Sequence, residues 1–288
     1  MWQHSALRLQ EVKVASSYSD LHQYRACPRL FGFKKLGYIS PKTTEPLATG
    51  GLAHIGIAAH FKGQDVEAAI DKAIEVEYSV AVSRLDGNER GEYEAMLVKA
   101  KLRAKQLLKR YIPNWAKDYK AILVEPELRC AGVVCHPDLV AIHRNQRVIV
   151  DYKTSYHPDE RWYDISGQTD LYAFIVGQLG PTDDNRISLI IYDTISEEGI
   201  FRHMRPPRLA AGKRLFGAVQ ELDKLVTKDN SHNYPVNPAF LADPHPDYTC
   251  PSRCNFFTPC WLLDTGSWED CRDYLEENYL KEEWRRIT

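Results

Sequence analysis

The sequence predicts an α/β protein in which helices flank a mixed central sheet, with additions at both ends of the chain. Stretches with helical apolar spacing occupy the first part of the chain. Short segments rich in Val, Ile and Leu follow, with a helical stretch inserted among them. A cysteine-bearing tail and a charged last helix end the chain. This order predicts an α/β core with a helical N-terminal part and a cysteine-cluster C-terminal part.

The N-terminal part is expected to be helical. A helix over residues 17–37 would begin at a serine cap, Ser17 or Ser19. Longer helices are expected over 47–61, 65–83 and 88–112, and Pro113 would end the last of them.

The rest of the chain supplies the expected sheet. Strands are predicted over 121–128, 133–143, 147–153, 187–193 and 199–204. Helices are predicted over 164–179 and 209–226. We therefore expect a single domain, residues 1–288, in three parts: a helical part (1–120), a core (121–226) and a cysteine-cluster segment (227–288).

The composition is that of an ordinary globular protein, with 44% hydrophobic and 26% charged residues. The chain has no apolar run of about 18 residues and no signal peptide pattern, so we expect a soluble cytoplasmic protein without membrane contact. The net charge of −2 does not favour nucleic-acid binding. Basic residues do crowd two segments, around 25–35 and 99–110, although such clusters can equally be solvated helix faces.

Two carboxylates and a lysine stand out on a predicted hairpin. If its turn is the two residues 144–145, antiparallel pairing places Asp138 opposite Asp151. Strand residues two apart share a face, so Lys153 lies on the same face as Asp151. A three-residue turn would shift this register by one. Opposed carboxylates on a buried hairpin need compensation, which Lys153 and a divalent cation such as Mg²⁺ or Mn²⁺ would provide.

The same residues have a plainer interpretation, in which Asp138 lies in a turn and Asp151 and Lys153 form a solvated edge pair. The chemical interpretation is phosphodiester hydrolysis. A bound metal would polarise a phosphoryl oxygen and lower the pKa of a water molecule. Lys153 would hold that water or neutralise the charge that develops on phosphorus.

Three motifs resemble one nuclease family. The pattern Gly132…Pro137-Asp138…Asp151-Tyr152-Lys153 resembles the PD-(D/E)XK nuclease superfamily in its Asp-x-Lys form. Gln168-Thr169-Asp170-Leu171-Tyr172 resembles the Gln-x-x-x-Tyr signature of the RecB-type branch, and Gly50-Gly51-Leu52-Ala53-His54 resembles its Gly-x-x-x-His helix. The matches follow the family order over residues 50–172. The resemblance implies a restriction-endonuclease-like core.

The resemblance also implies roles for single residues. Its metal ligands would be His54, Asp138, Asp151 and the carbonyl group of Tyr152. Lys153 would be catalytic, and Gln168 and Tyr172, one helical turn apart, would position the lysine, the water or the DNA backbone. Taken singly, His54 could be a core histidine, and Gln168 and Tyr172 ordinary helix residues. Glu125 or Glu127 would correspond to an acidic residue before the core strands.

The seven cysteines indicate a metal centre, because an odd number in an intracellular chain argues against a disulfide framework. Cys250, Cys254 and Cys260 lie within eleven residues, and three thiolates call for a metal and a fourth ligand. Proximity in the sequence nominates Cys271. The segment 17–31, with Cys27 followed by proline, resembles the N-terminal motif of iron–sulfur nucleases of this branch, and that resemblance nominates Cys27.

The iron–sulfur nucleases in question include AddB and the CRISPR-associated adaptation nucleases. The resemblance implies that Cys27, Cys250, Cys254 and Cys260 hold a [4Fe–4S] cluster that clasps the two ends of the domain. The first C-terminal gap has three residues where the family has two, so Zn²⁺ is an alternative. The remaining cysteines would be small buried side chains: Cys130, Cys135 and Cys271.

The function expected from these motifs is that of a metal-dependent DNA exonuclease acting on single-stranded ends, in recombination, repair or CRISPR-type DNA processing. One alternative is a DNA-end-binding module that works with an integrase or a helicase. Another is a phosphodiesterase for RNA or a small molecule on the same metal centre.

Overall fold

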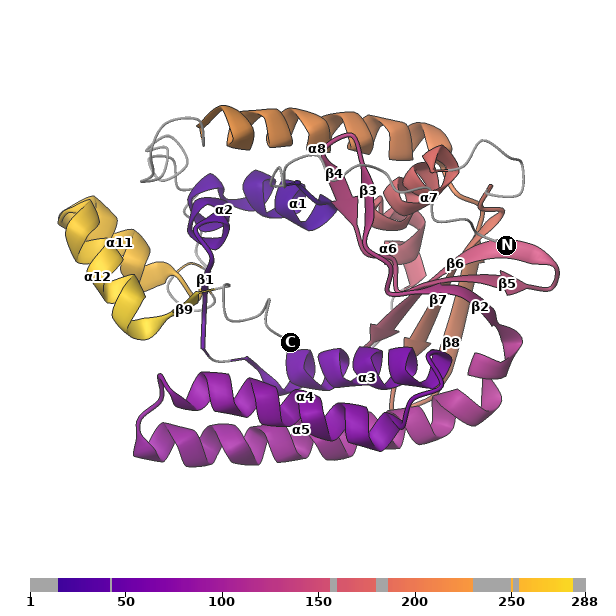
Figure 1. Cartoon of the computed structure of the whole chain (residues 1–288), viewed down its shortest axis with the longest axis horizontal. Helices are drawn as coiled ribbons and strands as arrows, with labels where there is room; N and C mark the ends of the chain where they lie inside the picture. Colours follow the sequence, from indigo (N-terminus) through magenta and orange to yellow (C-terminus); the bar gives the residue numbers. More distant parts are fainter. Residues whose placement is uncertain are drawn as a thin grey trace.

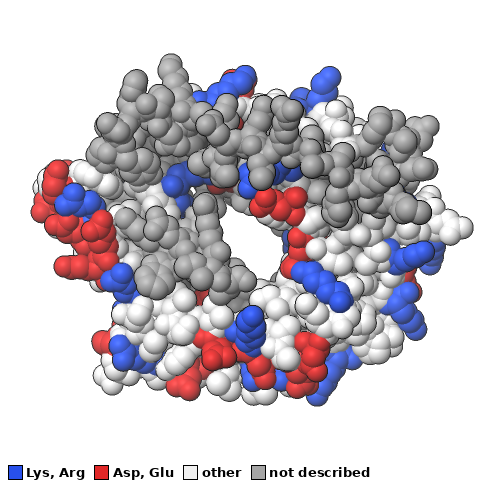
Figure 2. Space-filling view, in the orientation of Figure 1, with Lys and Arg blue, Asp and Glu red and all other residues white. Residues whose placement is uncertain are grey.

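A computed structural model describes residues 15–41, 43–155, 160–179, 186–229, 250 and 254–281. The elements surround a central opening in Figure 1: the sheet borders it on the right, the helix over residues 45–61 below, the helices over 18–35 above, and the short strands over 38–39 and 280–281 on the left. In the space-filling view the side chains of the described residues leave this opening unfilled (Figure 2).

A mixed five-stranded sheet forms the core, with the order β2-β5-β6-β7-β8. Its strands are β2 (Lys120–Val124), β5 (Leu139–His143), β6 (Gln146–Thr154), β7 (Leu189–Ile195) and β8 (Ile200–Arg205). β6 and β7 run parallel, and the other neighbours are antiparallel. The predicted fold class, a mixed sheet flanked by helices, is therefore confirmed.

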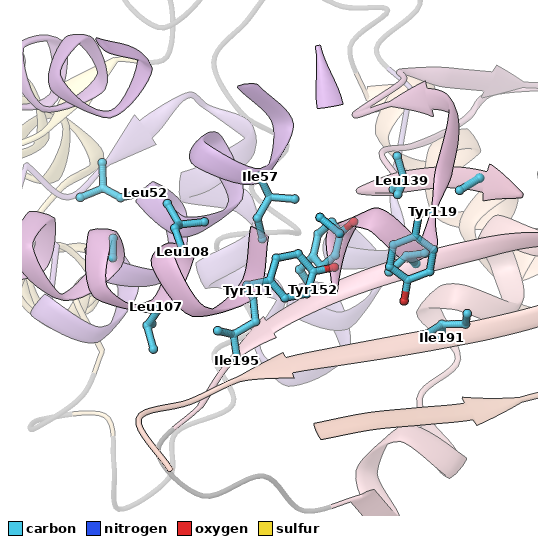
Figure 3. Close-up of a cluster of buried hydrophobic side chains, with 14 of the residues drawn as sticks. Leu52, Ile57, Leu107, Leu108, Tyr111, Tyr119, Leu139, Tyr152, Ile191 and Ile195 are labelled. Atoms are coloured by element: carbon cyan, nitrogen blue, oxygen red, sulfur yellow. The ribbon is translucent and has the colours of Figure 1, made fainter. Parts of the chain in front are cut away.

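The two faces of the sheet bury different helices, because successive strand residues point to opposite sides. One face packs against α3 (Glu45–Phe61), α4 (Val66–Val82) and α5 (Gly87–Asn114), with Tyr111 and Tyr152 inside the shared core (Figure 3). The other face packs against α7 (Gln168–Gln178) and α8 (Leu209–Asp229), with Ile149 and Tyr172 in that core.

Segments from near both ends of the described chain pack together. They are α2 (Pro28–Lys35), β1 (Tyr38–Ile39), α11 (Phe257–Thr265), α12 (Trp268–Asn278) and β9 (Leu280–Lys281). The preceding helix, α1 (Tyr18–Ala26), packs against α8 instead. β1 pairs antiparallel with β9. The rings of Phe33 and Phe256 stack with their centroids 5.4 Å apart, and Cys271 and Leu275 are fully buried beside them. We call this apolar cluster the clasp.

Three expected elements are divided. The helix expected over 17–37 breaks at Cys27, because a residue before proline is driven out of helical geometry. The strand expected over 133–143 splits, and its first part, β4 (Val133–Cys135), forms a separate hairpin with β3 (Leu128–Cys130) through Gly132 at φ 83°. The helix expected over 164–179 becomes α6 (Glu160–Ile165) and α7, separated at Gly167.

Parts of the expected organisation lie outside the described residues, namely 1–14, 230–249, 251–253 and 282–288. Within the part of the chain that is described, no helix combines the length and the apolar character that crossing a bilayer requires.

Candidate active site

The hairpin of β5 and β6 sets the position of the carboxylates. Its turn is the two residues Arg144 and Asn145, at φ 47° and 62°, as a two-residue hairpin turn with positive φ at both positions requires. The register expected for a two-residue turn is confirmed, with His143 facing Gln146. Asp138 lies just before the first paired residue of β5, and its Oδ2 accepts a hydrogen bond of 2.8 Å from the backbone N–H of Tyr152.

Asp151 and Lys153 form a close ion pair on the face of β6 that looks toward α7. Asp151 is 2% exposed, and the Lys153 Nζ lies 2.6 Å from its Oδ2. Burial raises the pKa of Asp151, and the charge of Asp138 adds to this against the opposing effect of Lys153. Among the described residues, the ion pair with Lys153 is the polar contact of this buried Oδ2. Asp151 thus offers an acceptor oxygen that is suited to a cation.

His54 reaches the carboxylates from α3. Its Nδ1 lies 3.4 Å from Asp138 Oδ1, and its ring meets Tyr152 edge-on at 6.1 Å. Burial lowers the pKa of His54, but the hydrogen bond and charge of Asp138 raise it, and the net shift is upward. One turn earlier, Gly50 allows this approach, because a Cβ at that position would lie 2.9 Å from the Thr154 Oγ1 at the end of β6.

Gln168 and Tyr172 close the site from the side of α7. The Gln168 amide donates a hydrogen bond of 2.6 Å to the Tyr172 hydroxyl, one helical turn away. Burial, together with the charge of Asp151, raises the pKa of Tyr172, so the phenol lies within electrostatic reach of the carboxylate. The structure therefore gathers the expected site residues where β6 ends, between α3 and α7.

The two candidate glutamates lie apart from this group. The Glu125 backbone N–H donates to the Asp138 carbonyl at 2.9 Å, but its side chain pairs with Lys62 at 3.2 Å. Glu127 pairs with Arg129 at 2.6 Å, and that hydrogen bond lowers the pKa of Glu127. Within the described part of the chain, these ion pairs with Lys62 and Arg129 occupy the two glutamate side chains and leave them outside the group around Asp151.

The donor set fits a hard divalent cation, because two carboxylates and an imidazole are oxygen and nitrogen ligands. Over the described ranges, no three His, Cys, Asp or Glu side chains stand in a ready-made metal arrangement. Each carboxylate instead engages a basic neighbour, His54 for Asp138 and Lys153 for Asp151. A bound ion would relieve the repulsion between the two carboxylates and add positive charge beside the buried Asp151, where Lys153 alone provides one.

Sequence reasoning missed the tyrosines beside Lys153. The parallel register of β6 and β7 sets Tyr192 next to Asp151 and Thr194 next to Lys153. The Tyr163 hydroxyl lies 2.5 Å from Thr194 Oγ1, and its ring stacks on Tyr192 at 4.5 Å. The strand predicted over 187–193 excludes Thr194, and no pattern in one sequence fixes a parallel register.

The four cysteines expected to bind a metal lie around α2 and α11. The Cys27 Sγ accepts from the Leu30 N–H at 3.5 Å, and the buried Arg29 guanidinium donates to the Cys260 Sγ at 3.2 Å. Burial raises the pKa of Cys254, and Cys250, Cys27 and Cys260 contribute to the increase. Of the other cysteines, Cys135 and Cys271 are buried, whereas Cys130 is partly exposed.

The fold and this arrangement of charged groups define the class of an α/β nuclease. Residues 15–260 match the family model of the PD-(D/E)XK nuclease superfamily, and the protein belongs to that superfamily. Its members generally use divalent metals such as Mg²⁺ or Mn²⁺.

No curated protein matches the chain. A crystal structure of a "Putative exonuclease" from Eubacterium rectale is similar, with 12% sequence identity and a TM-score of 0.46, over 81% of this chain and 88% of the other.

Proposed function

We propose that the protein is a metal-dependent exodeoxyribonuclease that hydrolyses DNA from single-stranded ends. The observation that carries this proposal is the buried Asp151 with Lys153 at 2.6 Å, next to Asp138 at the end of the central hairpin. Belonging to the superfamily supports the hydrolysis of phosphodiester bonds.

The chain's own groups divide the work. A divalent ion, held by His54, Asp138, Asp151 and the Tyr152 carbonyl, would polarise the phosphoryl oxygen and lower the pKa of a bound water. Burial lowers the pKa of Lys153, but the charge and hydrogen bond of Asp151 raise it by more. The net shift is upward, so the ammonium group stays charged. A charged Lys153 can orient the water and stabilise negative charge on phosphorus. Gln168 and Tyr172 would hold the lysine or the DNA backbone in place.

The central opening supports the preference for single-stranded ends. Helix α3, which carries His54, and the sheet that carries Asp151 both border it (Figures 1 and 2). An active centre beside such an opening favours a linear single strand of DNA, because its free end can be threaded through the opening. A circular single strand has no free end to thread.

The test of this proposal is a comparison of substrates with Mg²⁺ or Mn²⁺ present. Linear single-stranded DNA should be shortened from an end, circular single-stranded DNA should survive, and EDTA should stop the reaction. Cleavage of the circle would contradict exonuclease action. Faster turnover of RNA or of a nucleotide phosphodiester would favour the phosphodiesterase alternative.

The binding-module alternative would need basic surface, and the basic segment of α5 does not supply it. Lys101 pairs with Asp71 at 2.8 Å, and Lys105 pairs with Glu67 at 3.0 Å. Arg103 likewise contacts Glu45. The acidic side chains of α3 and α4 therefore neutralise much of this helix face, which favours its interpretation as a solvated surface.

We further propose that the protein belongs to the iron–sulfur RecB-type branch and forms one domain over residues 1–288, with a [4Fe–4S] cluster on Cys27, Cys250, Cys254 and Cys260. The electrostatic influence of these thiols on one another and the Arg29 donor at Cys260 support this. Purified protein should show a broad visible absorption band and contain iron and sulfide, and Cys27→Ala should lose both. A colourless protein that contains zinc would overturn the cluster in favour of Zn²⁺.

A further inference from the structure

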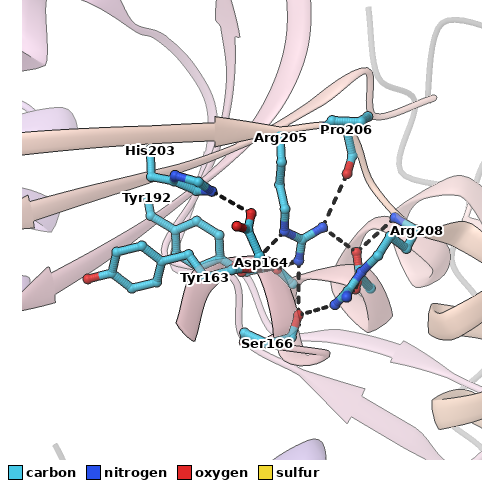
Figure 4. Close-up of polar contacts among 10 residues, drawn as sticks. Tyr163, Asp164, Ser166, Tyr192, His203, Arg205, Pro206 and Arg208 are labelled. Atoms are coloured by element: carbon cyan, nitrogen blue, oxygen red, sulfur yellow. Dashed lines mark hydrogen bonds and ion pairs between the residues drawn. The ribbon is translucent and has the colours of Figure 1, made fainter. Parts of the chain in front are cut away.

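A network of buried polar groups joins β8 to the corner between α6 and α7, just before Gln168 (Figure 4). Asp170 lies at its centre, in the first turn of α7, and is fully buried. It accepts hydrogen bonds from Arg205 Nη1 at 2.7 Å and from the Arg208 backbone N–H and Nε, each at 2.8 Å. A buried carboxylate needs such partners, so these contacts fix the start of α7.

Arg205 also determines where α6 ends. Its side chain comes from β8 and is almost fully buried. The guanidinium donates to the carbonyl oxygens of Tyr163 at 2.8 Å and Ser166 at 2.9 Å. Carbonyl groups at a helix end have no partner within the helix, so Arg205 satisfies them and sets the direction in which the chain enters α7. The same guanidinium lies 3.3 Å from Thr169 Oγ1 and 3.4 Å from the Tyr192 hydroxyl.

Tyr192 continues this network to the proposed active centre. Its hydroxyl lies 2.5 Å from Thr169 Oγ1, next to Gln168 in the chain, and both side chains are buried. On β7, Tyr192 is the register partner of Asp151. Tyr192 thus pairs with the carboxylate strand through its backbone, and its hydroxyl contacts the first turn of α7.

We propose that Tyr192 and Arg205 are positioning residues of the nuclease centre, which hold Gln168 and Lys153 in their working arrangement. The inference rests on the proposed function and deepens it. Neither residue needs to touch the substrate. Arg205 and Tyr192 act on Gln168 through Thr169 and the first turn of α7, and Tyr192 acts on Lys153 through its strand partner Asp151. Loosening the network should slow the chemical step on bound DNA more than it weakens DNA binding, since small misplacements reduce the rate strongly.

The chain offers a matched control on the opposite face of the sheet. Asp193, next to Tyr192 on β7, points the other way and accepts a hydrogen bond of 2.7 Å from the Tyr119 hydroxyl. Tyr119 and Tyr192 are both buried. Tyr192→Phe and Tyr119→Phe therefore each remove one buried hydroxyl group and leave the ring in place.

The test measures kcat and KM of the full chain on linear single-stranded DNA with Mg²⁺. Tyr192→Phe and Thr169→Val should each lower kcat about five-fold or more, with KM changed by less than about two-fold. Tyr119→Phe should keep both constants within about two-fold of wild type. Equal effects of Tyr192→Phe and Tyr119→Phe on kcat, or a loss confined to KM, would overturn the proposal.

Crystal structures of the same variants give a readout that does not depend on activity. Tyr192→Phe should displace Gln168 or Lys153 from the wild-type position, whereas Tyr119→Phe should leave both in place. An unmoved site in Tyr192→Phe would refute the positioning role. If the wild-type protein cleaves no DNA, the proposed function fails, and this structural comparison still decides whether Tyr192 positions these side chains.

Discussion

At the scale of single residues, stability outside the site depends most on buried carboxylates that accept several hydrogen bonds. Asp193 is fully buried and accepts hydrogen bonds from the hydroxyl groups of Tyr111 at 2.8 Å and Tyr119 at 2.7 Å. Arg202 adds donors at 2.7 and 3.0 Å, and its guanidinium lies 4.6 Å from the centre of the Trp115 ring. Asp193 thus ties α5 and the turn that follows it to the sheet.

The substitution Arg202→Ala should lower the free energy of unfolding by about 3 kcal/mol, because it leaves the Asp193 charge buried with fewer donors. Arg129→Ala removes a surface ion pair to Glu127 and should change the free energy of unfolding by less than about 1 kcal/mol. Urea unfolding of both variants measures the difference. Equal losses would show that burial of the Asp193 pair has no special cost.

The contacts of a site residue can be predicted from the sequence when its partners lie close to it in the chain. The shared face of Asp151 and Lys153 follows from strand alternation, whereas the hairpin register follows from the sequence only if the turn has two residues. The neighbours of Lys153 on β7 come from a parallel pairing across a helical connection, which no local pattern specifies. The contact of Asp138 with the Tyr152 N–H was hidden because Asp138 lies outside the paired part of β5.

At the scale of elements, close packing of α7 on α8 depends on one glycine. A Cβ at Gly212 would lie 2.3 Å from the Asp170 carbonyl oxygen, which is a backbone atom and cannot turn aside. Gly217, in the same helix, faces open space. The approach of α8 to α7 therefore requires glycine at position 212 and not at 217.

Gly212→Ala should lower the free energy of unfolding by roughly 2 kcal/mol, because α8 must move away from α7. Gly217→Ala should leave stability unchanged or raise it by up to about 1 kcal/mol, since alanine favours a helix interior. Thermal unfolding of the two variants provides the comparison. A Gly212→Ala protein as stable as Gly217→Ala would mean that the two helices do not pack this closely.

The types of most elements were predictable, and their interruptions less so. The helices and strands follow apolar spacing, which one sequence shows directly. The break between α1 and α2 lies at Cys27, which caps α2 through its own side chain. The proline that follows disfavours helical geometry at Cys27. The break before α7 depends on Arg205, which lies far along the chain and satisfies the carbonyl groups at the end of α6.

At the scale of the whole molecule, the clasp joins segments from near both ends of the described chain through an apolar core of its own. Phe256 stacks between Phe33 and Tyr279, and β1 pairs with β9. The described ends are therefore held together by packing and strand pairing, to which the proposed metal centre at Cys27 would add a covalent constraint.

The buried thiol in the clasp should make stability fall at alkaline pH. Burial raises the pKa of Cys271 to about 11, above the value of about 8.5 in an unfolded chain. The protonated thiol therefore contributes stability that is fully present below about pH 8.5 and is lost as pH rises through about 11.

Between pH 9 and 10.5 the wild-type protein should lose stability faster than Cys271→Ala, by at most about 1.4 kcal/mol per pH unit. Urea unfolding at three pH values, with the difference between the two proteins taken at each pH, measures this contribution. Parallel pH profiles would contradict the burial of this thiol in the folded protein.

The central claim is that Lys153, paired with the buried Asp151, is the catalytic lysine of a DNA-cleaving centre. Single-turnover cleavage of linear single-stranded DNA with Mg²⁺, by Lys153→Ala beside Lys62→Ala, tests it most directly. Lys62 is a matched control, because it forms an ion pair with Glu125 away from the carboxylate pair. The rate should fall on the order of 100-fold or more for Lys153→Ala and stay within about two-fold for Lys62→Ala. Cleavage at the wild-type rate by Lys153→Ala would contradict the claim.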